Sequence, residues 1–351
     1  MSYIQKPKVH HPALKPNKIG LTRRDYEGAL TTLCAGCGHD SITAAIIQAF
    51  WELDIEPYKV AKLSGIGCSS KTPAYFLREA HGFNSVHGRM PAVATGAGAA
   101  NGELMMIGVS GDGDSLSIGL GQLCHAIRRN LNLLYVLENN GVYGLTKGQF
   151  SASADPGSTS KRGAENTMAA IDGVLLALSL GATFVARSFS GDKAQLVPIL
   201  KAGLMHKGFA FVDIISPCVT FNDHEGSTKS YAHTRKHQLE VVHADFIPLR
   251  QEITTEYDPG SEQIVTLHDG GHVKLRKVAE DYDPTDRDYA YAYIREIQSK
   301  GEVATGLLYV SGDSKDMHEQ LGTLPEALTK VPYSKLCPGS ATLAKLQERF
   351  R

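Results

Sequence analysis

The sequence lacks a long hydrophobic run and has no surplus of charge of either sign. No apolar stretch approaches the roughly 18 residues of a membrane-spanning helix, so we expect no membrane span and no membrane partner. The 36 Lys and Arg residues balance 37 Asp and Glu residues. Because nucleic-acid binding favours a basic surface, we expect no nucleic-acid partner. Internal repeats and low-complexity segments are also absent from the sequence.

The amino-terminal segment lacks the apolar core of a secretory signal. Residues 1–16 are basic and Pro-rich, and we expect them to form an extended part of an N-terminal arm, residues 1–29, that lies on a partner subunit of a cytoplasmic protein. The 351 residues are enough to bury a large core. The six cysteines of a cytoplasmic protein favour metal binding or redox chemistry over disulfides.

Short apolar runs alternate with helical patterns between residues 30 and 220. This alternation predicts an α/β fold, a doubly wound and mostly parallel sheet covered by helices, as one domain. The expected strands are 58–63, 104–109, 131–137, 183–186 and 209–215; the expected helices are 41–53, with Asp40 or Ser41 as N-cap, 91–101, 118–129, 168–180 and 192–206. Residues 82–89 and 151–165 are expected to be loops. The second loop is expected to lie over the candidate site formed by residues 111–149.

Residues 221–351 show a different pattern and are expected to form an irregular C-terminal extension. Helices are expected at 231–242 and 289–300. Polar and apolar residues alternate over 254–277 around two Gly-containing turns, which predicts an antiparallel hairpin. We find no catalytic signal in this part of the sequence.

Two polar motifs follow neighbouring predicted strands. Gly111-Asp112-Gly113 comes after the strand at 104–109, and Asn139-Asn140 comes 25 residues later. Ligands bind at the carboxyl ends of strands in open α/β sheets. A carboxylate, an amide oxygen and a backbone carbonyl of the next turn suit Mg²⁺, and the glycines let the backbone approach a diphosphate. The alternative is a pair of ordinary surface turns.

Four cysteines lie beside turns at the ends of predicted elements and could converge. They are Cys34 and Cys37 of a C-x-x-C pair, Cys68 and Cys218. Four thiolates hold either zinc or a [4Fe–4S] cluster, and spacing alone does not separate the two. Cys124 lies in a predicted helix and is expected to be a small buried hydrophobe, whereas Cys337 has no assigned role.

These motifs together resemble one enzyme family. Gly-Asp-Gly followed by Asn-Asn resembles the thiamine-diphosphate fingerprint, and its continuation over 142–149, Val-Tyr-Gly-Leu-Thr-Lys-Gly-Gln, resembles the β subunits of 2-oxoacid:ferredoxin oxidoreductases. The Cys-x-Gly-Cys-Gly-His at 34–39, the Ile-Gly-Cys-Ser at 66–69 and the late Pro217-Cys218 follow the order of that family's cluster ligands.

The resemblance implies a thiamine-diphosphate-binding fold with three cofactors: thiamine diphosphate, Mg²⁺ and one [4Fe–4S] cluster. Magnesium would be held by Asp112, Asn140 and the Val142 carbonyl. The cluster would be held by the four cysteines Cys34, Cys37, Cys68 and Cys218. The residues that would line thiamine diphosphate are Ile66, Gly67, Cys68, Ser69, His87, Gly113, Asp114, Gly144, Leu145 and Thr146.

The same resemblance places further side chains near the reacting carbon. His87 would contact the cofactor and Lys71 would bind the substrate carboxylate. Leu145 would form a wall of the substrate pocket, and Lys147 would meet an anion of coenzyme A or of the substrate. Taken alone, these are ordinary loop residues. Asp114, Arg89 and His39 are expected to support the site from behind.

The implied reaction is the coenzyme A-dependent oxidative decarboxylation of a 2-oxoacid, with single electrons passing through the cluster to ferredoxin. The glutamate that activates the aminopyrimidine ring belongs, in this family, to a separate pyrimidine-binding domain. We therefore expect an α subunit that supplies it, in a heterodimer or a dimer of heterodimers. A ferredoxin-type cysteine run is also missing, so electrons are expected to leave to a separate ferredoxin.

The chain length, the C-terminal extension and Lys71 favour 2-oxoglutarate over pyruvate, since a dicarboxylate needs a cation for its distal carboxylate. Pyruvate, or a broad range of 2-oxoacids, is the alternative substrate. A non-oxidative thiamine enzyme with structural zinc is a rival hypothesis. A scaffold or electron-carrying subunit is another, but a carrier has no need of the Asp112–Asn140 pair.

Overall fold

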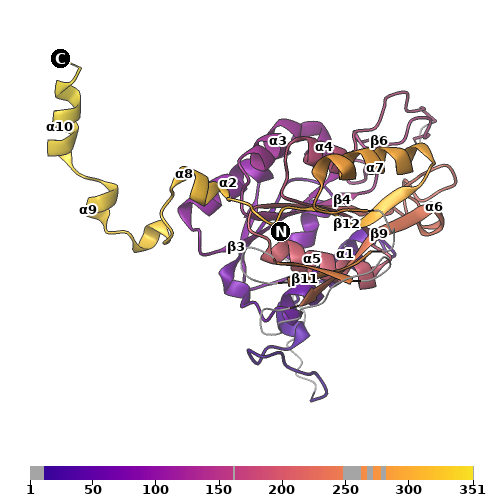
Figure 1. Cartoon of the computed structure of the whole chain (residues 1–351), viewed down its shortest axis with the longest axis horizontal. Coiled ribbons are helices and arrows are strands. Elements are labelled where there is room, and N and C mark those ends of the chain that lie inside the picture. The colour runs from indigo at the N-terminus through magenta and orange to yellow at the C-terminus, as the bar shows by residue number, and fades with distance from the viewer. Residues whose placement is uncertain (1–11, 161–162, 248–261, 267–271, 278–281, 351) are drawn as a thin grey trace.

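A ten-stranded sheet runs through the molecule, with helices on both faces (Figure 1). The computed structural model describes residues 12–160, 163–247, 262–266, 272–277 and 282–350. The strand order is β10-β11-β9-β12-β7-β8-β4-β3-β1-β2. This architecture confirms the predicted α/β fold with a mostly parallel sheet.

The parallel part of the sheet carries the predicted strands. Its members are β1 (Val60–Ser64), β2 (His81–Asn84), β3 (Met105–Gly111), β4 (Leu133–Asn139), β7 (Phe184–Phe189) and β8 (Phe209–Ile215). β1, β4, β7 and β8 are buried along their whole length, because helices cover both faces. β2 is an exposed edge strand that overlaps the loop expected at 82–89, so that expectation was wrong for its first residues.

Helices α1 (Gly38–Glu52) and α5 (Lys193–Met205) cover one face of the sheet (Figure 1). The other face is covered by α2 (Met90–Ala100), α3 (Leu120–Arg128), α4 (Gly173–Ser179) and α7 (Arg287–Ser299). α1 begins earlier than predicted, with Cys37 rather than Asp40 or Ser41 as N-cap. α4 is shorter than predicted because Asp172 caps its start, where the carboxylate accepts two backbone N–H groups.

Short elements fill the connections near the predicted site. They are η1 (Arg23–Tyr26), η2 (Pro57–Lys59), η3 (Ser69–Ala74), the π-helical turn η4 (Gly113–Ile118) and a small hairpin of β5 (Val142–Tyr143) and β6 (Gln149–Phe150). The helix expected from residue 118 is therefore α3, preceded by a π turn. Such turns occur often at functional sites.

The described part of the N-terminal arm packs on its own chain. The Asn17 side chain donates to the Trp51 carbonyl at 3.1 Å, and the Trp51 indole donates to the Leu21 carbonyl at 3.1 Å. Tyr26 is fully buried. The interpretation of residues 1–16 as an extended arm on a partner subunit stays a prediction, and residues 1–11 lie outside the described part.

The C-terminal region adds strands to the same sheet. These are β9 (Gln238–Ile247), β10 (Glu262–Thr266), β11 (His272–Lys277) and β12 (Val303–Val310), of which β12 pairs antiparallel with β7. The helix expected at 231–242 is wrong in its second half: α6 (Tyr231–His237) ends where β9 begins, because Val241 and Val242 are buried in the sheet. β10 and β11 pair antiparallel as predicted, and the rest of the hairpin lies outside the described residues.

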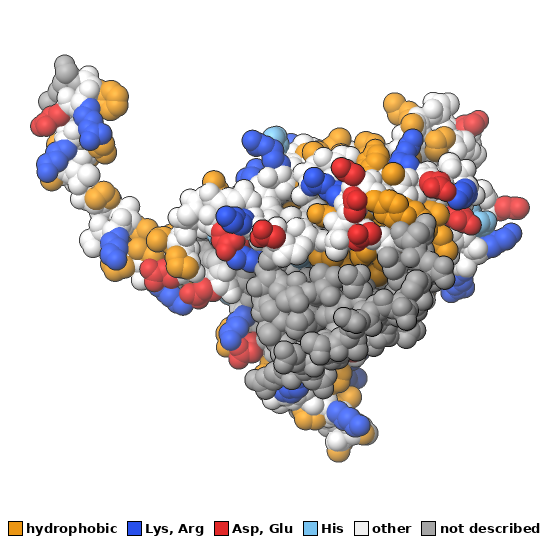
Figure 2. All heavy atoms as spheres, viewed as in Figure 1, with side chains coloured by type: hydrophobic (Ala, Val, Ile, Leu, Met, Phe, Trp, Pro, Cys, Tyr) orange, Lys and Arg blue, Asp and Glu red, His pale blue; other side chains and the backbone are white. Residues whose placement is uncertain are grey.

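The last described residues lead away from the body of the molecule (Figure 1). They contain α8 (Met317–Leu321), η5 (Leu328–Lys330), α9 (Tyr333–Leu336) and α10 (Ser340–Glu348). Hydrophobic side chains are exposed along this arm, including Tyr333, Leu343 and Phe350 (Figure 2). Within the described part of the chain, we find no helix both long and apolar enough to cross a membrane.

Candidate functional site

The Asp112 carboxylate lies at the carboxyl end of β3 and is 1% exposed. Its Oδ2 accepts hydrogen bonds from Gly141 N at 3.0 Å, from Ser153 Oγ at 2.6 Å and from the Ser151 hydroxyl. Its Oδ1 accepts a long bond of 3.4 Å from Asn140 N. Oδ2 is therefore held by three donors, and Oδ1 has capacity left for a cation.

Asn140 follows β4, the parallel neighbour of β3. Its side-chain Oδ1 accepts a hydrogen bond from Val142 N at 3.0 Å, which closes the turn after the strand. Its carbonyl accepts a hydrogen bond from Asn222 Nδ2 at 2.8 Å. Asn140 is 5% exposed and Val142 is 8% exposed. The ends of two neighbouring strands thus bring the Asn140 backbone and the Asp112 carboxylate together in one buried place. A carboxylate, an amide oxygen and a backbone carbonyl are a donor set that suits Mg²⁺.

Gly113 and Asp114 hold the surrounding turns close together. A Cβ on Gly113 would overlap the ring of Tyr143, whose hydroxyl donates to the Gly113 carbonyl at 3.0 Å. Asp114 Oδ1 accepts hydrogen bonds from Gly88 N at 2.7 Å and Ile66 N at 3.3 Å. The Asp114 carboxylate therefore fixes the turn after β1 and the loop that contains His87.

Of the four predicted cysteine ligands, Cys68 and Cys218 lie against the loop that follows Asn140. A Cβ on Gly144 would lie 3.4 Å from the Sγ of Cys68 and 3.8 Å from the Sγ of Cys218. Thr220 Oγ1 donates to the Sγ of Cys34 at 3.6 Å. All six cysteines are free thiols, and Cys34 is exposed.

Burial disfavours ionisation of three of these thiols. It raises the pKa of Cys37 to about 12, and it also raises the pKa of Cys68 and of Cys218. Neighbouring thiols add to the increase, since Cys218 acts on Cys37 and Cys34 acts on the other two. These effects link each of the four thiols electrostatically to Cys218 or to Cys34.

Four thiols can serve either zinc or an iron–sulfur cluster. The described residues contain no group of three or more His, Cys, Asp or Glu side chains close enough to hold a single metal ion. Zinc draws its sulfur ligands to about 2.3 Å, whereas a four-iron cluster separates its thiolates by its own core.

A buried pair, His39 and Glu138, lies behind the thiols. His39 Nδ1 is 2.6 Å from Ser216 Oγ and 3.3 Å from Glu138 Oε2, which also accepts a hydrogen bond from Thr72 Oγ1 at 3.0 Å. Burial lowers the pKa of His39 to about 4 and raises the pKa of Glu138 well above its ordinary value, so burial favours the neutral form of both side chains. The pair ties the segments that carry Cys37, Cys68 and Cys218 to the end of β4.

Comparisons with known proteins agree with this geometry. The family described as "Thiamine pyrophosphate enzyme, C-terminal TPP binding domain" matches residues 65–214. A relative in Saccharolobus solfataricus, "2-oxoacid:ferredoxin oxidoreductase subunit beta", is 43% identical over 208 residues, which are 59% of this chain and 68% of that protein. The chain belongs to the 2-oxoacid:ferredoxin oxidoreductase β subunits.

Two further relatives of this β subunit are named for one substrate. The "2-oxoglutarate oxidoreductase subunit KorB" of Mycobacterium tuberculosis is 43% identical over 194 residues, covering 54% of this chain and 51% of that protein. A solved structure is titled "2-oxoglutarate:ferredoxin oxidoreductase from Magnetococcus marinus with 2-oxoglutarate, coenzyme A and succinyl-CoA bound". Its matching chain has 31% identity and a TM-score of 0.71, with 89% of this chain and 91% of that chain covered.

Other predicted residues of the β subunit lie at the rim of the site. His87 is exposed in the loop after β2, and Lys71 is half-buried on η3, where its charge opposes the burial that raises the pKa of Cys68. The turn after β5 contains Leu145, which is 48% exposed, Thr146, which donates to Gln149, and Lys147, which has a φ of +77°. This turn presents its Gly144 backbone to the thiols and its side chains to solvent. The roles of these residues stay predictions.

Ser151 and Ser153 were missed in the sequence, where residues 151–165 were expected to be a loop over the site. Ser153 Oγ bonds Asp112 Oδ2 and also lies 2.9 Å from Asn139 Oδ1. The Asn139 side chain in turn donates to Asp213 Oδ1 at 3.1 Å. A Ser-x-Ser pair soon after the Asn-Asn motif was the available signal, and its meaning depended on the fold of the loop.

The same network continues to an ion cluster around Arg187. Its Nε is 3.0 Å from Asp213 Oδ2 and its Nη2 is 2.8 Å from Asp172 Oδ1. Gln298 of α7 donates to the other oxygen of Asp172. Arg187 is 6% exposed, and removing one member of such a buried cluster costs about 3–5 kcal/mol. Helix α7 is thus joined through hydrogen bonds to the Asp112 region.

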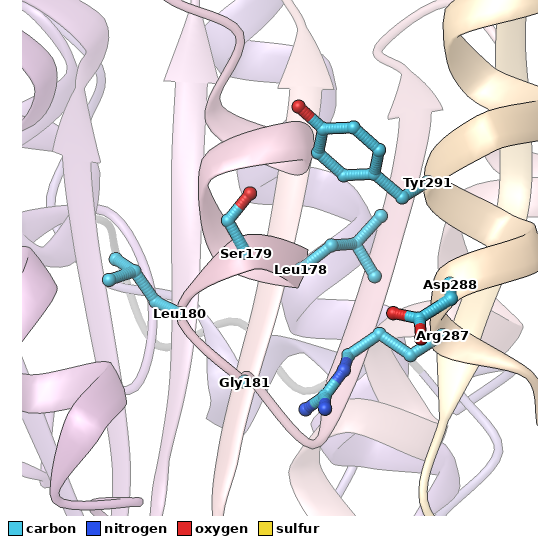
Figure 3. A pocket seen from close by; sticks show the side chains of 7 residues that line it. All are labelled: Leu178, Ser179, Leu180, Gly181, Arg287, Asp288 and Tyr291. Carbon is cyan, nitrogen blue, oxygen red and sulfur yellow. The ribbon is translucent and has the colours of Figure 1, made fainter.

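A second hollow, between α4 and α7, is separate from the Asp112–Asn140 region (Figure 3). It holds about 470 Å³ and is lined by Leu178, Gly181, Arg287 and Tyr291, among others. Gly181 precedes β7, so the hollow lies near the amino end of that strand. Asp112 and Asn140 follow the carboxyl ends of parallel strands, at the opposite edge of the sheet.

Proposed function

We propose that this β subunit, together with an α subunit, catalyses the coenzyme A-dependent oxidative decarboxylation of 2-oxoglutarate to succinyl-CoA and CO₂, with single electrons passed to ferredoxin. One observation carries the proposal: the loop after Asn140 lies between an oxygen site and a thiol site. The Asp112 side of this loop suits a magnesium diphosphate, and its Gly144 backbone lies against Cys68 and Cys218.

When bound, thiamine diphosphate supplies the carbon nucleophile for decarboxylation, and a [4Fe–4S] cluster supplies a one-electron acceptor. We propose that Asp112, Asn140 and the Val142 carbonyl hold Mg²⁺. The cluster ligands in this proposal are Cys34, Cys37, Cys68 and Cys218. Glu138 Oε1 at the end of β4 is a buried oxygen without a hydrogen-bond partner among the described residues, and such an oxygen is open to a bound ligand or water.

The remaining groups bind and orient. Asp114 holds the Ile66 and Gly88 turns around the cofactor, and His87 contacts it from the second of these. We assign the substrate carboxylate to Lys71 and an anion of coenzyme A or of the substrate to Lys147. A dicarboxylate substrate needs a cation for its distal end, and the relatives named for 2-oxoglutarate support this choice.

The pyrimidine-activating glutamate is assigned to the α subunit, in line with the name "subunit beta" of the relatives. Ferredoxin is the electron acceptor in the names of these relatives, and we propose the same acceptor here. The chain described here therefore supplies half of an active site and needs the α subunit for turnover.

The test is an anaerobic preparation of the α–β complex, assayed with coenzyme A, ferredoxin and either 2-oxoglutarate or pyruvate. We expect about four irons per chain, a cluster signal in low-temperature electron paramagnetic resonance after 2-oxoglutarate is added, and a higher kcat/KM for 2-oxoglutarate. Zinc in place of iron would refute the cluster assignment. Equal or better turnover of pyruvate would refute the substrate assignment, and an unreduced cluster would refute the oxidoreductase.

A further inference from the structure

A hollow lies beside the loop that carries Cys34 and Cys37. Its walls come from five segments: the loop itself, the start of α1, the end of β7, the start of α5, and α6. The lining side chains and backbone include Gly36, Ser41, Ser190, Lys193, Tyr231 and Arg235. We call it the Lys193–Arg235 hollow.

The two charged side chains that line this hollow are both positive. Lys193 and Arg235 are both exposed, and the residues that line the hollow include no carboxylate. Three acids stand near by in the sequence: Asp40, Asp192 and Asp223. Asp192 accepts a hydrogen bond from Gln195 N at 3.1 Å, and Asp223 accepts one from Tyr231 N at 2.9 Å, so these two carboxylates are held by backbone groups. The lining of the hollow itself therefore presents two cations to a binding partner.

The hollow is joined directly to the thiol loop. The Tyr231 hydroxyl donates to the Gly36 carbonyl at 3.1 Å, and the Arg235 guanidinium lies 5.4 Å from the centre of the Tyr231 ring. Gly36 stands between Cys34 and Cys37 and has a φ of +80°. Cys34 is itself exposed. A protein seated in this hollow would thus touch the segment that carries two of the four thiols.

We propose that the Lys193–Arg235 hollow is the docking surface for an acidic ferredoxin, an inference that rests on the proposed function. The two cations steer a negatively charged partner to the exposed side of the thiol loop, where the distance for electron transfer is short. Oxidation of one 2-oxoacid with coenzyme A releases two electrons. Two ferredoxins that each gain one electron therefore dock in turn and leave reduced.

The experiment uses the anaerobic α–β complex and two charge reversals, Lys193→Glu and Arg235→Glu. Affinity for oxidised ferredoxin is measured by isothermal titration calorimetry at low and high salt. Turnover is measured with ferredoxin and, separately, with methyl viologen, a small cationic acceptor. The matched control is Lys300→Glu at the end of α7, on the opposite face of the sheet.

We expect each reversal to weaken ferredoxin binding by about tenfold or more at low salt, with a smaller effect at high salt. The KM for ferredoxin should rise in parallel, while viologen-coupled kcat, iron content and the cluster spectrum stay unchanged. Lys300→Glu should leave all of these unchanged.

Unchanged affinity and KM in both reversals would overturn the docking proposal while leaving the proposed function intact. Loss of the α subunit from the variants would also overturn it, because the hollow would then be a subunit interface. A wild-type complex that reduces viologen but not ferredoxin would overturn the proposed acceptor and this inference together.

Discussion

The oxygen site around Asp112 and the thiol site of the four cysteines lie on two sides of one loop, yet they are built differently. The Asp112 carboxylate is held by backbone and serine donors before any ligand arrives. Cys37, Cys68 and Cys218 are partly buried, and burial raises the pKa of each of these three thiols. Hydrogen bonds within the chain therefore hold the oxygen site in place, whereas thiols with raised pKa values would have to release protons before they could bind a metal.

The strongest test of this separation is Asp112→Ala. We expect it to abolish binding of thiamine diphosphate with Mg²⁺, because the carboxylate is the charged ligand of the oxygen site. Iron content should be retained. Titration of thiamine diphosphate by fluorescence and iron analysis of the same sample check both expectations. If the iron is lost as well, the two sites are one unit and the contrast fails.

The reverse test is Cys68→Ser. We expect loss of the cluster and of ferredoxin reduction, since a hydroxyl replaces one of four thiolates. Binding of thiamine diphosphate should change little. Cys124→Ser is the control, because Cys124 lies within α3. Full iron content and an unaltered cluster spectrum in Cys68→Ser would contradict the ligand assignment.

Ser153→Ala probes how the oxygen site is held ready. The lost hydroxyl bonds both Asp112 and Asn139, so we expect the apparent affinity for Mg²⁺ to fall about 10- to 100-fold. Activity titrated against Mg²⁺ measures this. Ser158→Ala is the matched control, because that hydroxyl donates to the Asp155 carbonyl instead. Equal effects of both changes would show that the serine acts through the loop fold alone.

The smallest expected effect is the pH dependence of iron binding. Burial raises the pKa of Cys37 to about 12, so iron must displace a proton there, and mass action favours loading as the pH rises. We expect the apparent iron affinity of the apo complex to increase by about tenfold per pH unit for each proton released. Reconstitution followed by absorbance between pH 7 and 9 checks this. A flat profile would mean that the thiols are already ionised.

Much of the fold could be predicted from local sequence. β8 was predicted with its observed bounds because an apolar run, interrupted only by Asp213, is typical of a buried strand. β9 could not be separated from α6, since a short apolar segment fits a helix or a strand until the neighbouring β11 and β12 are known. The short β2 depends in the same way on its pairing with β1.

The residues of the candidate site also fall into those that could be predicted from local sequence and those that could not. The cysteines and Asp112 could be named because few residue types perform their chemistry. Ser153, Ser216 and Thr72 could not, because a hydroxyl acquires its role from partners that lie far away in the sequence. Glu138 in an apolar strand was a visible signal of a buried polar contact, but the sequence gives no hint that His39 is its partner.

The edge strand β2 has a practical consequence for anyone who produces this subunit. Its four residues are exposed, and within the described part of the chain it pairs with β1 alone, which leaves the backbone donors and acceptors of its other side without a strand partner there. Open edges of this kind recruit strands from other chains, and a subunit made by itself offers a template for aggregation. Co-expression with the α subunit gene, rather than refolding of the isolated chain, is the sound route to soluble material.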